Sequence, residues 1–176
     1  MTMSDRLAVM RHGKIEQLGH PEDVYDSPAT QFVAAFLGAS NLLDGEVEGN
    51  TDHMTTVALR TGDKVRVPND RLPPDAGTTV KVGVRPEKIT IVADGGVPAS
   101  DVNSVTGLLR MATYIGVSHQ YKVEGPGGAV LTVYVQNLGA GPAPGPGDTV
   151  RLTWKPEHTF VVKPSDEPPI EEEEES

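Results

Sequence analysis

The chain contains no cysteine among its 176 residues, and only 5% of its residues are aromatic. The lack of cysteine excludes disulfide bonds, thiol catalysis and zinc sites built from thiolates. No apolar run approaches the ~20 residues that a membrane-spanning helix needs. The first residues also lack the cationic and apolar regions of a cleaved signal peptide. We therefore expect a cytoplasmic protein without direct membrane insertion.

The negative charge of the chain is concentrated at its C-terminal end. The formal net charge is −10, and residues 165–176 contain seven acidic side chains without a lysine or arginine. The other 18 acidic residues are balanced by 15 basic ones, so the rest of the chain is close to neutral. It has no dense basic patch of the kind that binds nucleic-acid backbones. The sequence therefore predicts a disordered acidic tail at residues 164–176 and no nucleic-acid partner.

An internal repeat is the clearest pattern in the sequence. Gly77–Val92 returns seventy residues later as Gly147–Val162, in the same register. Each copy contains a glycine turn, a strand, a break at Arg-Pro-Glu or Lys-Pro-Glu, and a second short strand. Proline causes the break because it removes a ladder donor and restricts the residue before it. The two copies predict a duplicated small β unit.

Short β-rich runs divided by Gly, Pro, Asn and Asp extend from about Asn41 onward. Five runs fall in each unit, which is the number that an OB-like barrel requires. We predict a mainly β fold of tandem OB-like barrel units, with a first unit at 41–93, a linker at 94–103 and a second unit at 104–163. The expected strands are Leu42–Glu48, Thr55–Arg60, Lys64–Val67, Thr79–Arg85 and Lys88–Val92, then Val105–Ala112, Gln120–Val123, Val130–Val135, Thr149–Lys155 and Thr159–Val162.

Residues 1–40 follow a different pattern. Arg6–Leu18 predicts a short β-hairpin with Gly13 in its turn. Proline at positions 21 and 28 marks two helix starts, because proline suits the first helical position. The second helix is expected at Pro28–Leu37. Its apolar face, which needs a partner surface, consists of Phe32, Val33, Phe36 and Leu37.

The repeated corners contain the charged residues that most invite a functional interpretation. Glu87 and Glu157 occupy equivalent places, yet each is better placed to hold a turn through nearby backbone N–H groups than to act as an acid or base. Arg85 and Lys155 beside them are either ligands for a small anion or members of structural ion pairs and solvated surface. We predict no catalytic and no cofactor-binding residue.

Histidine, serine and large aromatic residues add no site. The histidines lie in separate elements without metal-ligand spacing, and they are His12, His20, His53, His119 and His158. No serine lies in a Gly-x-Ser-x-Gly elbow, so a nucleophilic triad has no anchor. Trp154 and Tyr114 are expected in the core of the second barrel. We predict no metal site.

Motifs along Met3–Lys163 resemble a known family. The first set resembles the end of the nucleotide-binding domain in ATPase subunits of ABC importers, and it comprises Ser4–Met10, Gly13–Gly19, Pro21–Tyr25, Pro28, Phe32–Ala34 and Phe36–Gly38. The second set resembles the TOBE domain, a transport-associated OB-fold, and it comprises Asn41–Gly45, Val84–Glu87, Tyr114–Gly116, His119–Tyr121 and Trp154–Glu157. The Tyr-Ile-Gly motif, followed by Tyr121 and Val135–Asn137, is most similar to the spermidine/putrescine-type branch.

The resemblance implies the C-terminal portion of an importer ATPase subunit, with a remnant of the nucleotide-binding domain at 1–40 and a TOBE domain at 41–163. In this family the phosphate loop, signature loop, catalytic Glu and switch His lie upstream of the matched segment. This sequence contains none of them, since its glycine-rich stretches have no Lys-Ser/Thr and no following helix. We therefore expect no enzymatic activity and no cofactor in this chain, whereas the complete parent subunit uses ATP and Mg.

The resemblance also implies a function. It is that of a regulatory and dimerisation module in an ATPase subunit that serves the import of a polyamine or similar small solute. The expected partners are a second copy of the ATPase subunit and, through the parent complex, the membrane subunits at the inner face of the cell membrane. Two alternatives stay open: a stand-alone sensor of a small anion or metabolite, and an inactive gene fragment.

Overall fold

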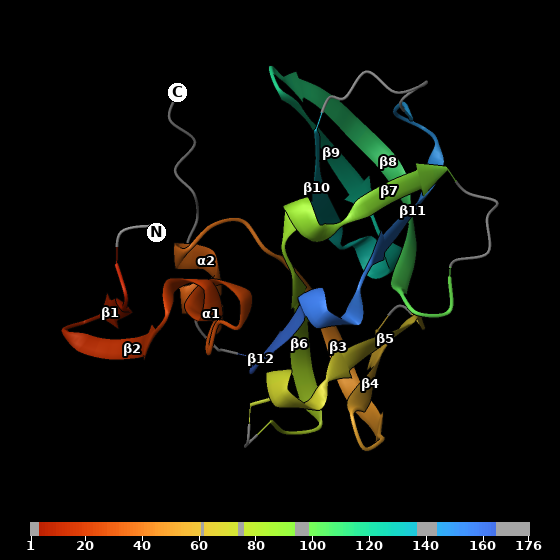
Figure 1. Ribbon diagram of the computed structural model, residues 1–176. Coiled ribbons are helices and arrows are strands. Elements are labelled where there is room, and N and C mark those ends of the chain that lie inside the picture. Colours follow the sequence, from red (N-terminus) through yellow and green to blue (C-terminus); the bar gives the residue numbers. More distant parts are fainter. Residues whose placement is uncertain (1–3, 61, 74–75, 94–98, 137–143, 165–176) are drawn as a thin grey trace.

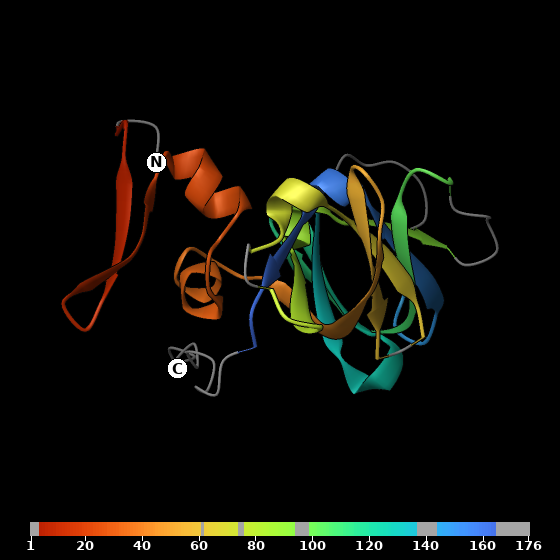
Figure 2. The same ribbon diagram turned by 90° about the horizontal axis from the view of Figure 1, so that it is seen from below.

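A computed structural model describes residues 4–60, 62–73, 76–93, 99–136 and 144–164. Its N-terminal elements lie beside two five-stranded sheets, as Figures 1 and 2 show from two directions. These elements are a hairpin of β1 (Leu7–Arg11) and β2 (Lys14–Gly19), followed by α1 (Pro21–Asp26) and α2 (Gln31–Phe36). The remaining elements are mainly strands, which confirms the predicted fold class. In the described part of the chain, no helix is long and apolar enough to cross a bilayer.

The two sheets contain antiparallel strands drawn from both halves of the chain. The first sheet has the order β12-β6-β3-β4-β5 and the second has the order β10-β9-β8-β11-β7. The first consists of β3 (Asn41–Asn50), β4 (Met54–Leu59), β5 (Lys64–Pro68), β6 (Thr79–Val84) and β12 (Thr159–Val162). The second consists of β7 (Thr90–Ala93), β8 (Asn103–Ile115), β9 (Ser118–Glu124), β10 (Val130–Gln136) and β11 (Thr149–Trp154).

The last strand of each repeated unit crosses to the other sheet. β7 follows β6 in sequence but pairs with β11, while β12 follows β11 but pairs with β6. The crossings occur at two short 3-10 turns, η2 (Pro86–Lys88) and η4 (Pro156–His158). Each turn begins at the proline of the repeat, where a ladder hydrogen bond is impossible and the strand has to stop.

This exchange differs from the strand grouping expected from the sequence. The sequence predicts five strands in each unit, with β7 in the first unit and β12 in the second. Each sheet contains five strands, but β7 lies in the sheet of the second unit and β12 in the sheet of the first. Sequence order predicts a neighbour along the chain, whereas the partner of an edge strand depends on packing between distant segments. The unit boundaries therefore stay predictions. The acidic tail beyond residue 164 and half of the linker, residues 94–98, lie outside the described residues.

One apolar core lies between the two sheets, and the two sheets with this core are the barrel of the protein. It is built from aliphatic side chains of both, among them the fully buried Val57, Val123 and Leu152. Trp154 belongs to it as predicted, and its indole Nε1 donates a hydrogen bond of 2.9 Å to Thr159 Oγ1. The same prediction for Tyr114 is wrong, because the ring is 61% exposed on a part of β8 that extends beyond the barrel.

The second helix starts later than the sequence predicted. It begins at Gln31 rather than Pro28, because Thr30 is its N-cap and Thr30 Oγ1 accepts a 3.2 Å hydrogen bond from the backbone N–H of Val33. The expected apolar face is divided between two environments. Val33 packs in a small N-terminal cluster with Val9 and Val24, whereas Phe36 stays 59% exposed.

Two asparagines connect the sheets at equivalent points. Asn41 Nδ2 donates to the carbonyl of Thr132 at 2.8 Å, and Asn41 Oδ1 accepts from the Thr132 N–H at 2.7 Å. Asn103 binds both backbone groups of Arg66 in the same way, at 2.8 Å each. Each asparagine opens its strand and satisfies the edge strand of the opposite sheet. Neither asparagine is predicted as a link between sheets, although the spacing Asn-x-x-x-Gly occurs at both positions.

Replacing Asn41 with Ala should destabilise the fold by about 1–3 kcal/mol, because the backbone N–H and carbonyl of Thr132 lose their partner. Urea unfolding followed by circular dichroism measures this change. Asn50→Ala is the control, since Asn50 is exposed at the hairpin end of the same strand. Equal midpoints for the two variants would show that the Asn41 contact does not stabilise the barrel.

Candidate docking site around Arg85

The two Pro-Glu corners of the repeat have nearly the same backbone. Arg85 has φ −73° and ψ 140°, and Lys155 has φ −72° and ψ 142°. Both are in the extended region that a residue before proline prefers. The turn then closes through a 3.0 Å bond in each copy, from Lys88 N to Arg85 O and from His158 N to Lys155 O. The prediction that the repeat marks corresponding corners of two units is confirmed.

The side chains at these corners have opposite environments. Arg85 is 1% exposed, whereas the side chain of Lys155 is 64% exposed. Lys155 Nζ lies 3.5 Å from Glu157 Oε1, a surface ion pair that contributes little to stability. The expectation of an ion pair or solvated surface is therefore correct for Lys155 and wrong for Arg85. Of these two side chains, Arg85 is the one buried against the N-terminal segment.

Arg85 uses its guanidinium to bind backbone oxygens of the N-terminal segment. Its Nη1 donates to the carbonyls of Ala34 at 2.9 Å and Gly38 at 3.0 Å, and to Ser40 Oγ at 2.7 Å. Its Nη2 donates to the carbonyl of Tyr25 at 3.0 Å. The carbonyls come from the end of α1 and from both α2 and the loop after it. One side chain of the barrel thus holds several turns of the preceding segment together.

Aromatic rings cover the same guanidinium. The Arg85 Cζ lies 4.1 Å from the centroid of the Tyr25 ring and 5.7 Å from that of Phe160. Burial lowers the pKa of Arg85, while the nearby Tyr25 and Glu87 oppose that change. Hydrogen bonds to carbonyls and cation–π contacts compensate a buried cation for its lost water. The candidate role of Arg85 as an anion ligand is not favoured, because its terminal nitrogens bind these oxygens.

Tyr25 connects this cluster to Glu87. The Tyr25 hydroxyl donates a 2.7 Å hydrogen bond to Glu87 Oε1. Burial, and then this hydrogen bond, raise the pKa of Tyr25 to about 12. The sequence predicts that Glu87 binds backbone N–H groups near its own turn, but its partner in the structure is the hydroxyl of Tyr25 in α1. The role is structural, as the sequence analysis favoured, but it joins two parts of the chain.

Further contacts fix the N-terminal segment to the barrel. Arg71, in the 3-10 turn η1 (Asn69–Arg71), donates to the carbonyl of Asp26 at 3.0 Å and also to Ser27 Oγ. Gln31 Nε2 donates to the carbonyl of Lys163 at 3.0 Å. Apolar packing adds to these bonds, since Ala34 of α2 is buried with Phe160 and Val162 of β12.

Gly83 makes room for the Phe160 ring in this interface. A Cβ atom on Gly83 would lie 2.0 Å from Phe160 Cε2, far inside van der Waals contact. The two residues are directly paired between β6 and β12. In the other copy of the repeat, Thr153 occupies the position that is equivalent to Gly83. The repeated backbone therefore does not require glycine at position 83. Glycine is needed there because the Phe160 ring, which packs against Ala34 of the N-terminal segment, occupies the space of a side chain.

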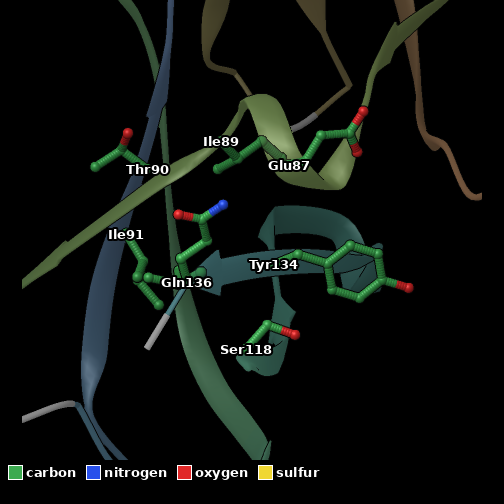
Figure 3. Close-up of a pocket in the computed structure, with 8 residues that line it drawn as sticks. Glu87, Ile89, Thr90, Ile91, Ser118, Tyr134 and Gln136 are labelled. Atoms are coloured by element: carbon green, nitrogen blue, oxygen red, sulfur yellow. The ribbon is translucent and has the colours of Figure 1, made fainter. Parts of the chain in front are cut away.

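Glu87 in the turn η2 also lines a cleft. It has a volume of about 330 Å³ and is formed by η2, β7, the start of β9 and the end of β10. Figure 3 shows Glu87 and Ile89 on one side of it, and Ser118, Tyr134 and Gln136 on the other. In the residues that the structure describes, no group of three or more His, Asp or Glu side chains is placed to hold a metal ion.

Comparisons with known proteins identify the class of domain. Residues 82–162 match the model of the TOBE domain, so this part of the chain is a TOBE domain. A crystal structure of the cytoplasmic molybdate-binding protein ModG with molybdate bound has the same fold, with a TM-score of 0.57 and 22% identity. The match covers 70% of this chain and 96% of that chain. At this identity the likeness concerns the fold alone.

The resemblance to spermidine/putrescine-type importer subunits is also confirmed. The chain is 37% identical over 174 residues to the spermidine/putrescine import ATP-binding protein of Acidothermus cellulolyticus, covering 98% of this chain and 45% of that protein. It is 38% identical over 163 residues to the protein of the same name from Thermobifida fusca, covering 92% and 41%. The chain thus spans less than half the length of these relatives and matches their C-terminal portion.

Arg85→Lys should destabilise the chain by about 2–3 kcal/mol, because a compact ammonium cannot reach the oxygens that the planar guanidinium binds. The matched control is Lys155→Arg at the equivalent exposed corner, which should change stability by less than about 0.5 kcal/mol. Urea unfolding of both variants measures the difference. Similar effects at the two corners would contradict the assigned role of Arg85.

Tyr25→Phe should remove a pH-dependent part of the stability. The folded pKa of Tyr25, about 12, lies above its unfolded value, so the contribution is complete below about pH 10 and is lost as pH rises toward 12. The difference in unfolding free energy between the wild-type chain and Tyr25→Phe should therefore shrink between pH 10 and pH 11.5. A difference that stays constant over this range would show that the hydroxyl contact contributes nothing.

Proposed function

We propose that this chain is the regulatory and dimerisation module of an ATP-binding subunit in a spermidine/putrescine-type ABC importer. The relatives with this name support the transport system, and the TOBE domain supports the place of the module within it. Its partners are a second copy of the ATP-binding subunit and, through the complex, the membrane subunits. The module works in the cytoplasm at the inner face of the membrane.

The Arg85 contact is the observation that carries this proposal. Residues 1–40 resemble the end of a nucleotide-binding domain, and Arg85 binds that segment at several carbonyls from within the barrel. A barrel held in this way moves with the nucleotide-binding domain as one body. Contact between two barrels therefore brings two nucleotide-binding domains together, because linked sites have a high effective concentration for each other.

The chain itself has no catalytic role in this proposal. ATP and Mg bind in the upstream part of the complete subunit, and the module contributes affinity between subunits. The alternative of an anion sensor at the repeated corners receives less support. Arg85 binds carbonyls there, and Lys155 forms an exposed pair with Glu157.

A chimera tests the proposal. The N-terminal portion of the Acidothermus cellulolyticus relative is joined to this chain, and ATP hydrolysis per subunit is measured against protein concentration. Arg85→Met should raise the concentration for half-maximal activity by at least about tenfold, because the barrels no longer hold the nucleotide-binding domains in place. Lys155→Met is the matched control at the exposed corner and should leave this concentration unchanged. A chimera whose specific activity does not depend on concentration, or on Arg85, would contradict a dimerisation role.

A further inference from the structure

We propose that the hairpin formed by the ends of β8 and β9 is a dimerisation arm, which places its apolar tip in the cleft beside Glu87 of a second copy of the chain. The arm comprises residues 110–122. This inference rests on the proposed dimerisation and specifies the surface that mediates it. In Figure 1 the arm extends at the top of the view, past η2 and β7.

The arm exposes apolar side chains on both of its faces. Every residue from Arg110 to Val117 is exposed. Among them Ile115 is 50% and Val117 86% exposed, and they flank the turn that Gly116 forms with φ 58°. A hairpin that belonged to the barrel alone would direct one face inward and a polar face to water. Apolar side chains on both faces of a protruding arm indicate an interaction surface.

The equivalent hairpin of the first unit provides an internal comparison. It joins β3 to β4 and ends in polar residues, and its turn is closed by a 2.8 Å bond from Thr51 N to Met54 O. Glu48 at its end pairs with Lys64 at 2.7 Å. The first unit, which has an equivalent fold, thus forms its hairpin with a polar end. The apolar tip of the β8–β9 arm is therefore not required by the fold.

The arm begins at a break in the strand register, and a row of rings runs along it. A register shift between Leu109 and Met111 marks the point where the arm leaves the barrel, as a β-bulge often does. Beyond it, the rings of Tyr114 and His119 lie 5.3 Å apart and those of His119 and Tyr121 lie 5.9 Å apart. This row of rings joins the exposed end of the arm to the buried Tyr121 at its base.

The cleft beside Glu87 suits the tip of such an arm. Ile89, Ile91 and Val135 supply apolar surface in its wall, and its volume is about 330 Å³. Ser118 belongs both to the arm and to the cleft wall, so tip and cleft are adjacent on one sheet. A two-fold axis near Ser118 therefore places each tip in the cleft of the other copy. The contact closes on itself, as an isologous interface requires.

Charge also favours a second copy as the occupant. Residues 110–122 contain no acidic residue, although the chain as a whole has a net charge of −10. Arg110 is paired with Glu124 of its own chain at 2.6 Å, so the exposed Lys122 is the positive charge that the arm offers to a partner. The rim of the cleft carries the exposed Glu87. A basic arm against an acidic rim gives electrostatic complementarity, which sets orientation and partner choice in interfaces.

Charged substitutions at the tip test the arm. Ile115→Asp and Val117→Asp should each raise the dimer dissociation constant of the chain at least about tenfold, because a carboxylate would be buried without a partner. Asn50→Asp adds the same charge at the end of the equivalent hairpin and should leave the constant unchanged. Light scattering across a concentration series measures the dimer, and circular dichroism melting curves report whether each variant stays folded.

Cysteine cross-linking tests the position of the tip. Because the chain has no cysteine, Val117→Cys and Thr90→Cys can be made separately and then mixed under mild oxidation. A mixed disulfide forms only where the Cβ atoms come within about 4.5 Å. We expect it between Val117→Cys and Thr90→Cys, and not between Asn50→Cys and Thr90→Cys.

The outcomes separate the arm from the proposed function. A chain that stays monomeric at every concentration would overturn both. A dimer that persists in Ile115→Asp and Val117→Asp, without the mixed disulfide, would keep dimerisation and overturn the arm. The arm would be established if Ile115→Asp and Val117→Asp lose the dimer and if Val117→Cys and Thr90→Cys form the mixed disulfide.

Discussion

A buried guanidinium determines how the two parts of this protein are joined. Arg85 stands at the end of β6 with 1% exposure, and such a cation is tolerated only where acceptors replace its water. The barrel does not provide these acceptors. They are carbonyls at the ends of α1 and α2, together with the ring of Tyr25. The position of the N-terminal segment is therefore coupled to the solvation of one side chain, because the segment supplies the oxygens and the ring that replace the water around Arg85.

The contrast between the two repeated corners shows how a duplicated fold acquires a single specialised surface. Both copies keep the same proline turn because both need to transfer a strand to the opposite sheet. Both also keep an asparagine that satisfies an edge strand of the other sheet. The differences lie in the side chains at these corners. Gly83 makes room for the Phe160 ring and Arg85 binds the N-terminal segment, whereas Thr153 and the exposed Lys155 stand at the equivalent positions of the other copy.

The sequence predicted features that depend on local chemistry and missed those that depend on distant partners. The proline turns, the N-terminal hairpin and the mainly β fold follow from residue preferences within short segments. The exchange of β7 and β12 does not, since either sheet offers an antiparallel edge of similar chemistry. The role of Arg85 was missed because its acceptors are backbone carbonyls, which every residue has and no motif reports. Tyr114 was misplaced because an aromatic residue in a strand suggests a core, and the length of the arm beyond the barrel has no local signal.

The turn η2 connects the two surfaces considered above. Arg85 immediately precedes it and holds the N-terminal segment, while Glu87 within it accepts the Tyr25 hydrogen bond and also lines the cleft. The turn is short and begins with a buried proline, so its ends cannot move independently. A partner seated in the cleft therefore touches the same rigid corner that binds the segment resembling a nucleotide-binding domain. The contact between two chains and the attachment of the N-terminal segment within one chain share this corner. A change at the contact between chains can therefore reach the N-terminal segment through η2.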